Sequence, residues 1–139
     1  MFGKEILKCY EEFAGPNKQL HKLDKDLWLI HAARITTTEA EIHFITNEDN
    51  VILHWGILKP YSDKTWLKPH KPYPIMSKET SSNALDTRFV EDVFMFDEKV
   101  YNVHIKMFDI EEIKGIIFVI NQYDKWYNNN KNNYHINFI

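Results

Sequence analysis

The stretch that decides the fold is VILHWGILKPYSDKTW, residues 51–66, which has the pattern of a strand followed by a polar turn and a tryptophan. Side chains of a strand point alternately to its two faces, so the odd-numbered residues from Val51 to Trp55 share one face. This apolar set predicts a core face. The opposite face carries His54 beside Gly56, which has no side chain and so leaves room for a flat group to lie against the sheet.

A two-residue period of apolar side chains recurs on both sides of this stretch. It predicts half-buried antiparallel strands over residues 39–44, 101–107 and 134–138. The run 116–120 is apolar on both faces, which is typical of a central strand, and Ile117 and Val119 are expected to be buried.

The connections between these segments carry their own signals. The polar turn 47–50 predicts a β-hairpin between the neighbouring strands, and a further strand is expected over 27–35. Residues 59–89 hold four of the five prolines, so we expect ordered irregular structure there. Six or seven short strands joined in this way predict an all-β fold, an immunoglobulin-like antiparallel β-sandwich.

The chain divides into an N-terminal segment, residues 1–26, and a sandwich domain, residues 27–139. Apolar residues spaced by three and four over residues 2–13 predict a short helix, and residues 17–26 a polar linker. The helix is expected to pack on the domain or to contact a protein partner. Its mixed Lys and Glu face argues against a membrane, and no run reaches the 20 or so apolar residues that a span needs.

Composition excludes several classes of function. The net charge of −3 gives no reason to expect nucleic acid as a partner, because phosphate binding needs a clustered excess of Lys and Arg. The single cysteine, Cys9, cannot form an intrachain disulfide or a cysteine-based zinc cluster, which is consistent with a reducing, cytoplasmic location. A plastid is not excluded.

Three ordered blocks carry a family resemblance. They are LHWG with the following turn and Trp66, then NALDTRF at 83–89, and finally WYNNNKNNYH at 126–135. Together they resemble the starch-binding module of α-glucan water dikinases, carbohydrate-binding module family 45, and are similar to the related family 25 modules. Arg88 stands where proline is usual in the second block. The resemblance implies an immunoglobulin-like sandwich and a non-catalytic module that targets an enzyme to α-glucan.

The candidate site consists of residues that could bind a neutral sugar. Trp66 and Trp126 each follow a polar turn, so we expect them to be exposed platforms for the C–H face of a glucose ring, with His54 between them. Asn132 and Asn133 are the further candidates, and Asn133 matches the asparagine before the family's aromatic–His pair. Trp55 and Trp28 are instead assigned to the core.

Other chemistries find little support in the sequence. The seven histidines form no H-x-x-x-H pair on an expected helix, so no metal site, catalytic residue or cofactor is predicted. The chain also lacks G-x-S-x-G and a phosphate-binding glycine loop, which argues against an enzyme. We therefore expect a binder of starch- or glycogen-type α-glucan or maltooligosaccharides. The alternative is an immunoglobulin-like scaffold domain that contacts a protein through the helix at 2–13 and binds no sugar.

Overall fold

The computed structural model describes residues 18–60, 62–93, 99–128 and 132–138. All regular structure in this part of the chain is β-strand. No helix among these residues is long and apolar enough to cross a membrane. The helix predicted over residues 2–13 lies outside the described residues.

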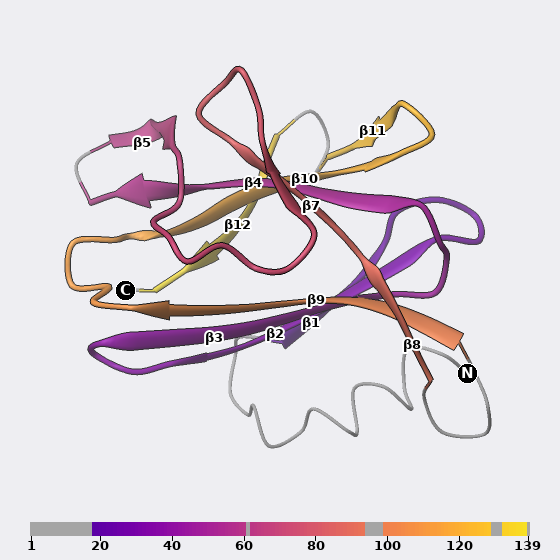
Figure 1. Cartoon of the computed structure of the whole chain (residues 1–139), viewed down its shortest axis with the longest axis horizontal. Helices are drawn as coiled ribbons and strands as arrows, with labels where there is room; N and C mark the ends of the chain where they lie inside the picture. The colour runs from indigo at the N-terminus through magenta and orange to yellow at the C-terminus, as the bar shows by residue number, and fades with distance from the viewer. Residues whose placement is uncertain (1–17, 61, 94–98, 129–131, 139) are drawn as a thin grey trace.

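Two antiparallel sheets pack face to face as the two layers of a sandwich (Figure 1). One sheet has the order β1-β2-β3-β9-β8, and the other follows the path β11-β10-β4-β7-β6, with β12 also pairing with β10 and β5 with β4. The strands of the first sheet are β1 Lys18–Lys22, β2 Trp28–Ile35, β3 Glu39–Thr46, β9 Lys99–Phe108 and β8 Val90–Val93. Those of the second are β11 Lys125–Tyr127, β10 Gly115–Gln122, β4 Val51–Lys59, β7 Leu85–Arg88, β6 Ser77–Glu79, β12 Tyr134–Asn137 and β5 Ser62–Leu67. The predicted sandwich is confirmed.

The core fills the space between the sheets with the inward-facing residues of both. Val51, Leu53 and Trp55 are fully buried, as the alternation in β4 predicts. Phe44 of β3 meets Phe118 of β10 edge to face, with ring centroids 5.1 Å apart, which joins the two layers. Further aliphatic residues complete this cluster.

Two side chains differ in burial from the expectation. Ile117 is buried as predicted, but Val119 is only half-buried, because β10 is a central strand whose outer face is partly open. Trp28, which we assigned to the core, is half-buried at the start of β2, with the Lys22 ammonium 5.5 Å from its ring centroid.

The predicted hairpin between the 39–44 and 51–58 strands is wrong. β3 pairs with β2 and β9 in one sheet, whereas β4 pairs with β7 and β10 in the other. The turn at 47–50 therefore carries the chain from one layer to the other. Sheets in a sandwich lie about 10 Å apart, and a four-residue link spans that distance easily. Both strands then bury their apolar faces against each other across the core.

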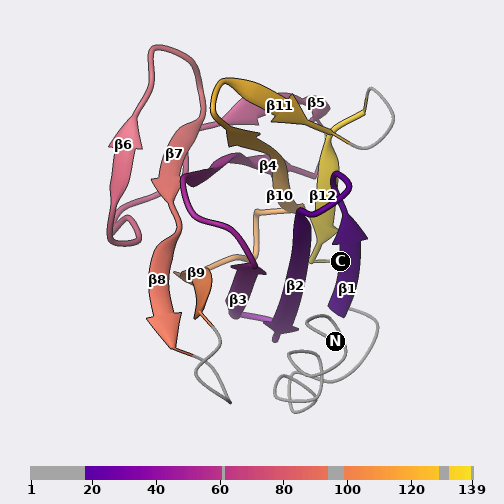
Figure 2. The ribbon, with the colours of Figure 1, turned by 90° about the vertical axis from the view of Figure 1, so that its right-hand side faces the viewer.

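Residues 59–89 contain more regular structure than expected. Strands β5, β6 and β7 all fall in this range, and β7 pairs on both sides, with β4 and β6. Figure 2 shows β7 running almost directly into β8, so the chain changes sheets at Phe89 between them. Phe89 is buried in the core at this corner.

The polar linker expected over residues 17–26 also contains a strand. β1 pairs along its whole length with β2, and it forms the edge of the five-stranded sheet. Figure 2 places β1 beside β12 at one side of the sandwich. Its composition is polar because β1 is an edge strand with little apolar surface to bury.

Candidate functional site

The outer face of the seven-stranded sheet carries the residues singled out in the sequence. Residues paired across neighbouring antiparallel strands share a face, so Asp86 of β7, His54 of β4 and Val119 of β10 form one outward row. The adjacent row contains Arg88, Ile52, Asn121 and Trp126. The sheet therefore presents an aromatic and polar surface directly behind the core residue Trp55.

His54 is held by a carboxylate from the neighbouring strand. Its Nδ1 lies 2.5 Å from Oδ1 of Asp86, the residue directly opposite in the register. An ionised carboxylate only accepts hydrogen bonds, so the proton of this bond belongs to Nδ1. The bond fixes the plane of the imidazole and leaves Nε2 as the ring atom that Asp86 does not engage.

Trp66 lies over the bare backbone of Gly56. A methyl group built on Gly56 would meet Cε3 of Trp66 at 3.2 Å, so the absence of a side chain makes room for the indole. Trp66 belongs to β5, which follows β4 through a tight turn and pairs with it at Ile57 and Lys59. Its ring centroid is 5.5 Å from that of His54, at 42°. The flat group expected beside Gly56 is thus partly the protein's own indole. Trp66 was expected to be exposed, but it is half-buried because it packs against Gly56 and His54.

Trp126 lies on the other side of His54, on the short strand β11. A two-residue turn joins β10 to β11, and both of its residues, Tyr123 and Asp124, have positive φ, as a type I′ hairpin requires. The ring centroids of His54 and Trp126 are 5.2 Å apart, with the planes at 74°. Trp126 is 53% exposed, which agrees with its predicted place at the surface.

The opposite face of β11 is hydrogen-bonded to Asp24, in the connection between β1 and β2 of the other sheet. Lys125 Nζ and the Tyr127 hydroxyl each donate to Oδ2 of Asp24, at 3.0 Å. The hydrogen bond from Lys125, followed by those from the Lys25 backbone amide and from Tyr127, lowers the pKa of Asp24 to about 2. Lys125 and Tyr127 are held by Asp24 on one face of β11. The side chain of Trp126, which lies between them in the sequence, therefore points to the opposite, outer face.

The three aromatic rings form one continuous surface. His54 is flanked by an indole on each side, and its side chain keeps 20% of its surface exposed. Such an arrangement offers two apolar faces of different exposure and one oriented polar edge between them. It suits a ligand with apolar C–H faces and hydroxyl groups.

The two candidate asparagines lie beyond this surface, just before β12. Asn132 is exposed and Asn133 half-buried. Continuing the β10–β12 register by one residue places Asn133 opposite Val119, and therefore two strands from His54. With strands about 4.8 Å apart, that separation is roughly 10 Å, a distance that a second glucose unit could span. The structure thus brings His54, Trp66 and Trp126 together, with Asn133 at the margin.

Asp86 is the site residue that the sequence analysis missed. It lies in the NALDTRF block, between the buried Leu85 and Thr87, so its outward direction was predictable from alternation. Its pairing with His54 was not, because the two residues are 32 positions apart.

Comparisons with known proteins agree with the fold. The family model described as the alpha-glucan water dikinase 1 Ig-like N-terminal domain matches residues 17–138. The chain is 30% identical, over 112 residues, to the curated protein "Alpha-glucan water dikinase 1, chloroplastic" of Arabidopsis thaliana. The alignment covers 78% of this chain but 7% of the relative, so the chain spans a small part of that protein's length. No solved structure matches the chain.

Proposed function

Because the chain belongs to the family of Ig-like N-terminal domains of alpha-glucan water dikinase 1, we propose that it binds α-1,4-linked glucan of the starch or glycogen type without catalysis. The observation that carries this proposal is the imidazole of His54, oriented by Asp86 and flanked by Trp66 and Trp126 on an exposed sheet face. Bound to the polymer, the module brings an attached or associated enzyme to its substrate.

The chemistry of the surface matches a neutral polysaccharide. A glucose ring has an apolar C–H face that packs on an indole, and hydroxyl groups at its edge that need hydrogen-bond partners. Trp126 supplies the more exposed platform, and Trp66 a smaller one. With the proton on Nδ1, Nε2 of His54 accepts a hydrogen bond from a hydroxyl group, and Asn132 and Asn133 serve a neighbouring sugar unit.

The expected affinity is low. Covering apolar surface contributes about 25 cal/mol per Å², so a sugar face of several tens of Å² on an indole contributes on the order of 1 kcal/mol. With a few hydrogen bonds of about 0.5–1.5 kcal/mol each, less the cost of immobilising the sugar, roughly 4–6 kcal/mol remains. That range corresponds to dissociation constants from the high micromolar to the millimolar. Weak single sites suit a targeting module, because a polymer offers many of them.

The comparison also bears on location. The dikinase relative is named as chloroplastic, and we accordingly assign the proposed function to a plastid. The cytoplasmic location expected from the sequence gains no support from that relative.

Affinity electrophoresis in gels containing amylopectin tests the proposal. We expect Trp126→Ala to abolish retardation, because it removes the more exposed platform. Trp66→Ala should reduce it strongly, and His54→Ala and Asp86→Asn should weaken it by smaller factors. Circular dichroism of each variant should show an unchanged fold.

The matched control is Phe108→Ala. Phe108 is an aromatic residue of similar exposure, 51%, on β9 of the other sheet, so its loss should leave retardation unchanged. The proposed site is wrong if Trp126→Ala and Trp66→Ala migrate like the unaltered chain in amylopectin. It is also wrong if the unaltered chain is not retarded at all, a result that would favour the scaffold alternative.

A further inference from the structure

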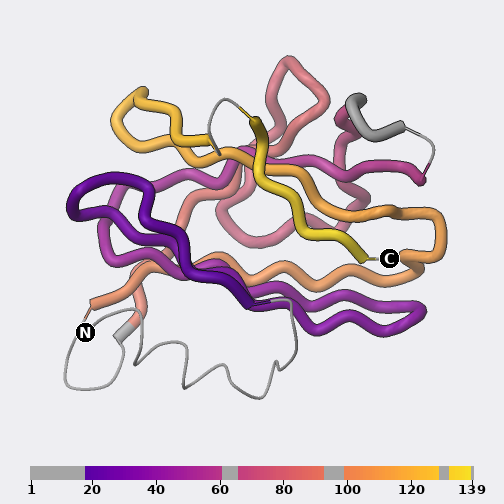
Figure 3. Tube along the Cα trace, turned by 180° about the vertical axis from the view of Figure 1, so that it is seen from behind, coloured from indigo at the N-terminus to yellow at the C-terminus, as the bar shows by residue number. Residues whose placement is uncertain are grey.

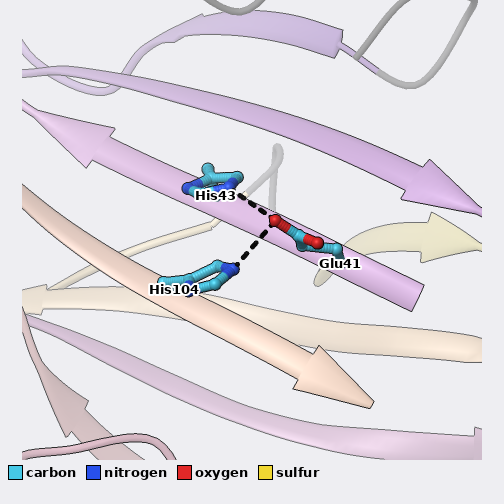
Figure 4. A group of neighbouring side chains, drawn as sticks. All are labelled: Glu41, His43 and His104. Carbon is cyan, nitrogen blue, oxygen red and sulfur yellow. Dashed lines mark hydrogen bonds and ion pairs between the residues drawn. The ribbon is translucent and has the colours of Figure 1, made fainter. Parts of the chain in front are cut away.

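A second cluster of polar side chains lies on the outer face of the other sheet. β3 and β9 pair so that His43 is directly opposite His104, and Glu41 is two residues from His43 on the same face. The two imidazoles stack with centroids 4.3 Å apart and planes at 11°. Figure 4 shows a nitrogen of each ring directed at the same carboxylate.

The distances within this cluster are those of a ligand set. Oε1 of Glu41 is 3.3 Å from Nε2 of His43 and 3.2 Å from Nε2 of His104. One ligand atom from each residue lies within 4.8 Å of the others. Tetrahedral zinc with bonds of 2.0–2.1 Å has its ligand atoms roughly 3.3 Å apart, so two of the three edges fit as they stand. The third edge, between the two imidazole nitrogens, is at most 4.8 Å.

Burial and mutual contact shift the pKa values of His43 and Glu41. Burial lowers the pKa of His43, and the neighbouring His104 lowers it further, whereas the hydrogen bond and charge of Glu41 act in the opposite direction. Burial acts to raise the pKa of Glu41, but the hydrogen bonds with His43 and His104 outweigh it and the pKa falls. A neutral imidazole binds metal through its unprotonated nitrogen, and Nε2 becomes that atom when the proton moves to Nδ1. Two imidazoles and one carboxylate then face one point.

Two neighbouring cations limit the affinity. Arg34 of β2 and Lys106 of β9 are both paired with Glu41 in the register. The Lys106 ammonium lies over the ring of Phe108, 5.5 Å from its centroid. The side chains of Glu41, His43 and His104 are 32%, 19% and 47% exposed, so an ion can reach them from solvent. These features describe an accessible surface site of moderate strength.

We propose that Glu41, His43 and His104 bind one divalent transition-metal ion of the zinc class. Two imidazoles and a carboxylate are borderline ligands that suit zinc, nickel or copper better than calcium or magnesium, which prefer oxygen. Water fills the remaining positions. This departs from the expectation, drawn from the sequence, that the chain holds no metal. His43 and His104 are 61 positions apart in the chain, so their pairing across two strands was not visible in any local spacing.

Isothermal titration of the metal-free chain with zinc chloride tests the site, with cobalt(II) absorption as a second readout of coordination. We expect one ion per chain, and a loss of affinity greater than tenfold in His104→Ala and in Glu41→Gln. His104 is nearly half exposed, so its truncation should not disturb the fold, and circular dichroism checks this.

The control is His70→Ala, which removes an exposed histidine from the loop between β5 and β6. Its zinc affinity should equal that of the unaltered chain. The site is disproved if the unaltered chain shows no saturable one-to-one binding, or if His104→Ala and Glu41→Gln bind zinc as tightly as His70→Ala does.

Discussion

At the scale of single residues, Trp55 shows how much one side chain stabilises. It is fully buried, and its Nε1–H donates to Oγ1 of Thr87 at 2.9 Å, inside the core. Trp55→Ala should lower the free energy of unfolding by about 3–5 kcal/mol, because it leaves a large cavity and loses that bond. Urea denaturation followed by circular dichroism measures the change. Trp28→Ala is the control, since the half-buried Trp28 should cost clearly less; equal losses would contradict the assignment.

Single residues also mark the limit of what the sequence reveals. The direction of a strand side chain follows from alternation, so the inward place of Trp55 and the outward place of His54 were both predictable. Which residues meet across strands depends on sheet order and register. Asp86 beside His54 and His104 beside His43 come from segments far apart in the chain, and no local period encodes those contacts. The two tryptophans beside His54 were found because of the family resemblance.

At the scale of elements, the connections were harder to predict than the strands. The period of two located β3, β4, β9 and β12 to within a few residues, and the run that is apolar on both faces located β10. It does not say whether successive strands pair in one sheet or face each other across the core, since both arrangements bury one face of each strand. That ambiguity explains the wrong hairpin at 47–50. The sequence of β5, SDKTWL, has no alternating apolar residues, and β6 has only three residues, too few to show a period.

The pairing of β10 with β12 rests on one glycine. A methyl group on Gly115 would lie 2.2 Å from the backbone oxygen of Ile136, so Gly115→Ala must displace β12. We expect a loss of about 1–3 kcal/mol and faster hydrogen exchange of the β12 amides. His135→Ala, which truncates an exposed side chain of β12, should change neither. Unaltered exchange in Gly115→Ala would show that β12 is not held against β10 in this way.

At the scale of the whole molecule, a histidine pair joins the two sheets at one edge. His21 of β1 and His31 of β2 share a hydrogen bond of 3.0 Å between Nε2 and Nδ1. The ring of His21 meets Tyr134 of β12 edge to face at 4.9 Å, and His31 meets Phe118 of β10 at 6.1 Å. Figure 3 shows β1, in indigo, on the same side of the sandwich as the yellow β12. Protonation of His21 or His31 would therefore weaken the packing between the two sheets at this edge.

The stability of the sandwich should consequently depend on pH. Burial lowers the pKa of His21 to about 4, and burial together with the charge of His21 lowers that of His31 to about 3. Unfolded histidine titrates near 6.5, so below that pH the unfolded chain binds more protons than the folded one. The free energy of unfolding therefore decreases as the pH is lowered. The stabilisation is complete above 6.5 and is lost progressively toward pH 4 and below.

Between pH 7.5 and 5.0, each fully shielded histidine accounts for about 2 kcal/mol of this loss, and the partial exposure of His21 reduces its share. We expect the free energy of unfolding in urea to fall by roughly 2–4 kcal/mol over this range. His43, whose pKa is also lowered, adds a change of the same sign that persists in the variant. His31→Leu removes one titrating group and should flatten the dependence, whereas His135→Ala, exposed on β12, should keep it. If His31→Leu loses as much stability between pH 7.5 and 5.0 as the unaltered chain does, the pair does not link folding to protonation.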